Sequence, residues 1–71
     1  MTTKNAAENA YAKAAGRLLR AARERRGWSL QSVQYRSGGA WPTAVVGSYE
    51  RGDRMISCER LHMLAAFYGV P

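Results

Sequence analysis

The chain has 71 residues, of which 46% are hydrophobic and 23% charged, so it has room for one small core and excludes a multidomain enzyme or a repeat array. Eleven lysines and arginines against five acidic residues give a net charge of +6, which favours nucleic acid, ahead of an anionic membrane, as the partner. One cysteine, Cys58, and one histidine, His62, exclude an internal disulfide and a structural zinc site.

The first predicted helix covers residues 11–26, where alanine, leucine and arginine dominate and proline is absent. Gly27 supplies its C-terminal cap. Residues 1–10 are expected to form an N-terminal arm or a frayed extension of this helix, which leaves residues 11–71 as the folded domain. Helical spacing places four apolar residues on the core face: Ala15, Leu18, Leu19 and Ala22.

A short second helix is predicted over residues 29–37. Ser29 is a favourable N-cap, and the apolar Leu30 and Val33 share one face of the helix. The two glycines at 38–39 end it, because consecutive glycines favour a turn.

Pro42 fits the first position of a third helix, where its missing N–H costs nothing. The helix is expected to continue over residues 43–51 with Tyr49 turned inward, together with Val45 or Val46.

Ser57 is the expected N-cap of a fourth helix. This helix carries an apolar stripe of Leu61, Leu64, Ala65 and Tyr68. The sequence therefore predicts an all-α protein, a compact bundle of four to five helices.

The second and third predicted helices, joined by a glycine turn, have the layout of a helix-turn-helix. In such a module the later helix enters the major groove of DNA, and basic side chains around it bind phosphates. The expected base contacts are Trp41, Thr43, Ala44, Gly47, Ser48 and Arg51, although Trp41 is equally compatible with the core. The expected phosphate contacts are Arg17, Arg20, Arg25, Arg26, Arg36 and Arg54.

Three stretches carry a family resemblance: LRAARERRGWS (19–29), AVVGSYERGDR (44–54) and ERLHMLAAFYGVP (59–71). They resemble the BldD-like DNA-binding domains of actinobacterial transcription regulators, within the wider Xre or lambda-repressor-like helix-turn-helix family. The resemblance covers residues 11–71. It implies a five-helix bundle that binds an inverted-repeat operator as a dimer, with the family's final helix absent from this sequence.

The resemblance also implies a structural ion pair between Arg23 and Glu50. Leu30 stands where the wider family has a glutamine, which removes one phosphate contact. The neighbours of Trp41 are uncharged here, whereas BldD-like proteins carry basic residues around that position.

We therefore expect a sequence-specific, double-stranded DNA-binding transcription regulator, a repressor that acts as a homodimer at the bacterial nucleoid in the cytoplasm. No nucleophile with a base, phosphate-binding loop or carboxylate pair indicates an enzyme. No cofactor, metal, small-molecule ligand or membrane contact is expected within this chain. The sequence is interpreted as a fragment without an effector domain or as a short, self-associating regulator. The alternative function is a protein-interaction module, such as an antitoxin or anti-activator.

Overall fold

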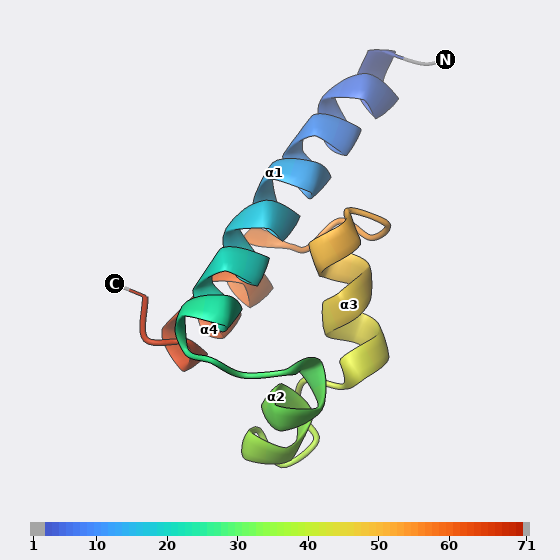
Figure 1. The fold of residues 1–71 in the computed structure, drawn as a ribbon. Coiled ribbons are helices and arrows are strands. Elements are labelled where there is room, and N and C mark those ends of the chain that lie inside the picture. Colours follow the sequence, from blue (N-terminus) through green and yellow to red (C-terminus); the bar gives the residue numbers. More distant parts are fainter. Residues whose placement is uncertain (1–2, 71) are drawn as a thin grey trace.

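The computed structural model describes residues 3–70, which form four α-helices and no strand (Figure 1). The helices are α1 (Thr3–Arg25), α2 (Leu30–Arg36), α3 (Thr43–Arg51) and α4 (Cys58–Phe67). The predicted all-α class and the order of the helices are confirmed. None of the described helices is long and apolar enough to cross a membrane.

Helix α1 is the longest element, and its first turns project beyond the other helices (Figure 1). The helix begins at Thr3, eight residues before the predicted start at Tyr11, so most of the expected arm or extension is helical. Met1 and Thr2 lie outside the described residues. At the other end, Gly27 adopts a positive φ of 74° after the last turn, as the predicted cap requires.

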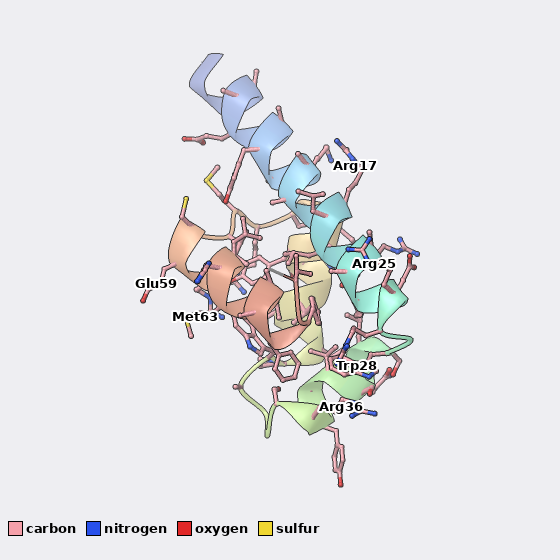
Figure 2. All side chains as sticks on the ribbon, turned by 90° about the vertical axis from the view of Figure 1, so that its left-hand side faces the viewer. Arg17, Arg25, Trp28, Arg36, Glu59 and Met63 are labelled. Atoms are coloured by element: carbon pink, nitrogen blue, oxygen red, sulfur yellow. The ribbon has the colours of Figure 1, made fainter. Side chains whose placement is uncertain are left out.

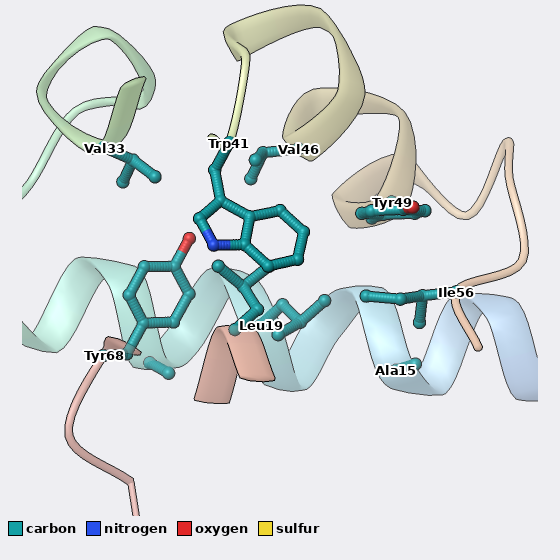
Figure 3. Packing of buried hydrophobic residues seen from close by; sticks show 10 residues of the cluster. Ala15, Leu19, Val33, Trp41, Val46, Tyr49, Ile56 and Tyr68 are labelled. Carbon is teal, nitrogen blue, oxygen red and sulfur yellow. The ribbon is translucent and has the colours of Figure 1, made fainter. Parts of the chain in front are cut away.

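Helix α1 is also the centre of the bundle, because it packs against both α3 and α4, whereas α2 packs against α3. Figure 3 shows the buried side chains that fill the space between these helices. Trp41 and Ile56 come from the connecting segments and complete this core. The other core residues are Ala15, Leu19, Ala22, Val33, Val46, Tyr49, Leu64 and Tyr68.

The predicted core face of α1 is wrong for one residue, Leu18. Leu18 is 69% exposed, whereas Ala15, Leu19 and Ala22 are buried. The three buried residues are spaced by four and three positions, so they share one face of the helix. Leu18 lies about 100° around the helix axis from Leu19 and therefore points away from that face. It faces a groove between α1 and α4 that Leu61 also lines.

The predicted N-caps of α2 and α4 are confirmed. The Ser29 hydroxyl accepts a hydrogen bond from the Ser32 N–H at 3.0 Å, and the Ser57 hydroxyl accepts one from the Arg60 N–H at 3.1 Å. Helix α3 begins one residue later than predicted: Pro42 has an extended backbone (φ −64°, ψ 147°) and is the N-cap itself.

Helices α1 and α3 approach each other closely at Gly16. A Cβ atom there would overlap the carbonyl oxygen of Tyr49 and lie 2.6 Å from the carbonyl oxygen of Glu50. Both atoms belong to the backbone of α3, so no side chain can rotate away to make room. Glycine at this position therefore sets the distance between α1 and the helix expected to read DNA.

We predict that Gly16→Ala lowers the free energy of unfolding by about 1–3 kcal/mol, the usual cost of overpacking, because α3 has to move away from α1. Chemical denaturation measures this loss. The control is Asn9→Ala on the exposed part of α1, expected to change stability by less than about 0.5 kcal/mol. Equal stability of the two variants would contradict the close packing.

Candidate nucleic-acid interface

Helices α2 and α3 form the helix-turn-helix unit, and residues 37–42 connect them. Gly38 and Gly39 both adopt positive φ values, 64° and 87°, in this connection. Such values are costly for residues that carry a Cβ. The predicted glycine turn is therefore present, and it directs α3 away from the end of α2.

The outer face of α3 is a narrow stripe of Ala44, Ser48 and Arg51, at spacings of four and three residues. Ala44 and Arg51 are exposed, and Ser48 is half-buried. The Ser48 hydroxyl donates to the Ala44 carbonyl oxygen at 3.0 Å, within the helix. Val46 and Tyr49 point into the core, as predicted.

Two other expected base contacts on α3 are less accessible. Thr43 is half-buried, and its hydroxyl is hydrogen-bonded to Gln34. Gly47 is buried: a Cβ there would lie 3.1 Å from Nη1 of Arg51 and 3.6 Å from Cδ1 of Leu30. The absent side chain of Gly47 lets the Arg51 guanidinium lie along the helix surface.

Arg51 is the cation of the stripe. Its Nε donates to Oδ2 of Asp53 at 2.8 Å, and the Arg51 side chain is 63% exposed. Because Nε is the atom in use, both terminal nitrogens remain available as donors. Arg20 lines the same hollow as Arg51, of about 260 Å³, and pairs with Glu24 at 3.1 Å.

The other arginines predicted to bind phosphate spread over several faces. Figure 2 labels Arg17 and Arg25 on α1 and Arg36 on α2. Arg25 lines the groove between α1 and α4. Arg26 and Arg36 both lie against the Trp28 ring, at 4.9 and 4.7 Å from its centroid. The remaining one, Arg54, lies 5.8 Å from the centroid of the Tyr49 ring.

The two tryptophans have structural positions. Trp28 is half-buried and packs against Phe67 with ring centroids 5.6 Å apart, which places it at the edge of the core. Trp41 is only 7% exposed, so the structure favours its core alternative over base stacking. Arg60 covers it, with its guanidinium 4.6 Å from the indole centroid, and donates to the Tyr49 hydroxyl at 3.0 Å.

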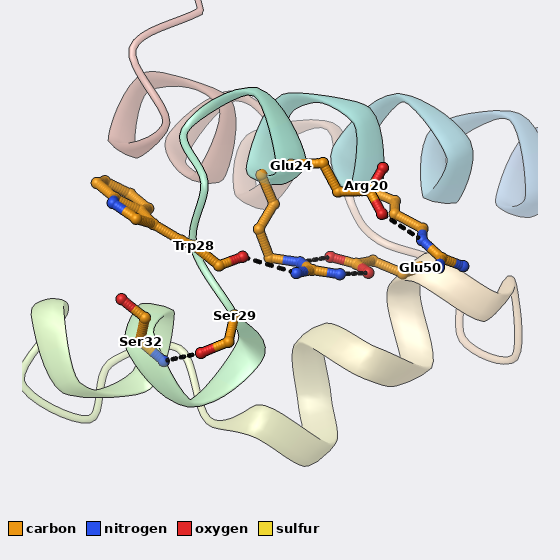
Figure 4. A network of polar contacts seen from close by, with 7 residues as sticks. Arg20, Glu24, Trp28, Ser29, Ser32 and Glu50 are labelled. Carbon is orange, nitrogen blue, oxygen red and sulfur yellow. Dashed lines mark hydrogen bonds and ion pairs between the residues drawn. The ribbon is translucent and has the colours of Figure 1, made fainter.

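The predicted ion pair between Arg23 and Glu50 is confirmed. Nε and Nη2 of Arg23 donate to the two carboxylate oxygens of Glu50 at 2.7 and 2.8 Å (Figure 4). Nη1 of Arg23 donates to the Trp28 carbonyl oxygen at 2.8 Å. The side chains are 12% and 6% exposed. Hydrogen bonding to Glu50 raises the pKa of Arg23. Because its hydrogen bonds reach Glu50 and the Trp28 carbonyl oxygen, this guanidinium links α1, the connection to α2, and α3.

We predict that Glu50→Gln lowers the free energy of unfolding by about 3 kcal/mol, because it leaves the Arg23 charge buried without its counter-ion. Urea denaturation followed by circular dichroism measures the change. Glu24→Gln is the matched control: it removes an exposed carboxylate paired with Arg20 on α1 and should cost less than about 1 kcal/mol. Similar losses of unfolding free energy in both variants would show that the buried pair stabilises the fold no more than the exposed one.

Tyr68 is a second buried polar group in this region. Its ring packs against those of Trp28 and Phe67, with centroids 6.2 and 6.0 Å away, and its hydroxyl has no hydrogen-bond partner in the part of the chain that the structure describes. Burial, reinforced by the negative charge of Glu50, raises the pKa of Tyr68 to about 12. The fold therefore favours the protonated form.

Because the pKa of Tyr68 is raised, this group does not alter the free energy of unfolding below about pH 10, the pKa of an unfolded tyrosine, and lowers it as the pH rises towards 12. We predict that Tyr68→Phe flattens the decline of stability over this range. At pH 8 it should be at least as stable as the parent, since the hydroxyl has no partner. Urea denaturation from pH 8 to 11 tests this, and identical pH dependence of both proteins would contradict it.

The geometry defines a helix-turn-helix protein, and the comparisons agree. The sequence matches the helix-turn-helix domain family over residues 14–71, and the chain belongs to this family. No curated protein matches it significantly. The described residues contain no group of three His, Cys, Asp or Glu side chains placed to hold a metal ion.

Within this family, the chain is a BldD-like domain. It is similar to the crystal structure of the DNA-binding domain of BldD, with 54% identity over 89% of both chains and a TM-score of 0.85. It is also similar to the structure of the S. venezulae BldD DNA-binding domain, with 56% identity over 86% of this chain and 88% of the other, and a TM-score of 0.82. The predicted resemblance is confirmed.

Proposed function

We propose that this domain binds double-stranded DNA sequence-specifically, with α3 in the major groove. The observation that carries the proposal is the exposed stripe of α3, in which small side chains lead to Arg51. Small residues let a helix seat deeply in a groove about 12 Å wide, and arginine suits the O6 and N7 acceptors of guanine. The likeness to the BldD DNA-binding domain and the net charge of +6 support the same function.

The proposed interface contains part of the predicted set. Ala44, Ser48 and Arg51 contact base edges, with Thr43 at the start of the helix. Arg20 is the favoured phosphate contact because it shares a hollow with Arg51. The other phosphate candidates that we keep are exposed arginines on α1, at the end of α2 and after α3: Arg17, Arg36 and Arg54. Burial argues against Trp41 and Gly47, and the places of Arg25 and Arg26 beside α4 argue against these two.

We further propose that the domain acts as a homodimer on an inverted-repeat operator and represses transcription at the nucleoid. Two-fold symmetry in the protein requires two-fold symmetry in the DNA, with the α3 helices about 34 Å apart in successive major grooves. The test is selection of duplexes from a randomised library at about 150 mM salt, where non-specific binding is weakened. Enrichment of an inverted repeat supports the proposal. Absence of any enriched sequence contradicts it and favours a protein partner.

We predict that Arg51→Ala weakens binding to the enriched duplex about tenfold or more, the usual cost of losing a bidentate base contact. Arg25→Ala is the control, because it removes the same charge beside α4 and should change affinity much less. Ser48→Ala should relax the sequence preference rather than reduce affinity uniformly. Fluorescence anisotropy with specific and random duplexes measures these effects. Equal losses for Arg51→Ala and Arg25→Ala would mean that α3 is not the reading helix.

A further inference from the structure

The side chain of Gln34 crosses from the last turns of α2 to the start of α3. Its Oε1 is 2.7 Å from the backbone nitrogen of Thr43 and 3.0 Å from the Thr43 hydroxyl oxygen. Gln34 itself is exposed. It therefore lies at the end of α3 that leads the helix into the proposed groove.

These contacts fix which way the amide of Gln34 points. The backbone N–H of Thr43 can only donate, so the atom facing it has to be the oxygen of the amide and not the nitrogen. The Thr43 hydroxyl donates to the same oxygen, so both lone pairs of Oε1 accept hydrogen bonds. The Nε2 group then faces away from Thr43 and offers two N–H donors.

This arrangement changes what Gln34 can recognise. A free glutamine offers one acceptor and one donor, which match N6 and N7 of adenine. With its acceptor occupied by Thr43, Gln34 offers donors alone. Among the bases, guanine presents two neighbouring acceptors, O6 and N7, in the major groove.

We propose that Gln34 is a specificity-determining residue that donates to guanine in each half-site, next to the bases contacted by Thr43 and Ala44. The inference rests on the proposed function of α3. Holding the amide in place before binding reduces the entropy that a flexible side chain loses on contact, which increases its contribution to affinity.

The test is Gln34→Glu, because glutamate has nearly the same shape. One carboxylate oxygen still accepts the two hydrogen bonds from Thr43, and a negative charge at the start of α3 is favourable. The other carboxylate oxygen, however, takes the place of Nε2 and is an acceptor, which suits the N4 amino group of cytosine. Library selection should enrich guanine at one position of each half-site with the parent protein and cytosine at that position with Gln34→Glu, the other positions being unchanged.

Gln31→Glu is the matched control. Gln31 lies one turn earlier on α2 and is exposed. Both glutamines border one hollow of about 420 Å³. Because it adds the same charge, it should weaken binding to all sequences without altering the preferred base. Against the parent's guanine site, Gln34→Glu should bind about tenfold or more weakly, and its thermal midpoint should not fall.

Two results would overturn the inference, and they differ from each other. If Gln34→Glu keeps the parent's base preference and loses affinity only as Gln31→Glu does, Gln34 is a helix cap or a phosphate contact. If the parent protein enriches no sequence at all, the proposed function of α3 fails, and the role of Gln34 fails with it.

Discussion

The buried pair of Arg23 and Glu50 is the interaction on which the arrangement of this domain depends. Arg23 comes from the last turn of α1 and Glu50 from the last turn of α3, and the same guanidinium also holds the Trp28 carbonyl oxygen before α2. A bidentate pair sets orientation as well as distance. Gly16 allows the backbones of α1 and α3 to meet just beside it, so the position of α3 is fixed from two sides.

The proposed reading surface follows from this fixed position. With one face of α3 held against α1 and the core, its outer face carries small side chains and Arg51. The start of the helix is held separately, by Gln34 from α2, and Arg60 stacks on Trp41 and binds Tyr49 on the inner side. Rigid placement matters because a base contact has to be made within a few tenths of an ångström.

The sequence predicted what depends on local chemistry and helical spacing. Ser29 and Ser57 cap their helices as expected, and Val46 and Tyr49 face the core, because N-capping and apolar periodicity act within one or two turns. The family resemblance supplied the pair of Arg23 and Glu50. Leu18 was misplaced because two adjacent leucines on a helix cannot both face a narrow core, and spacing alone does not choose between them. Gly16 and Gln34 gave no signal, since each acts through a contact with a different helix, Gly16 with the distant α3 and Gln34 with the start of α3 across the turn.

The central claim is that α3, with Gln34 beside its start, is the surface that meets DNA. The most direct test is nuclear magnetic resonance of the isotopically labelled protein during titration with a duplex enriched by selection. The account predicts that the largest shifts occur in backbone amides 43–48 and in the side-chain amide of Gln34. Shifts concentrated instead in the groove between α1 and α4, around Leu18 and Leu61, would contradict it.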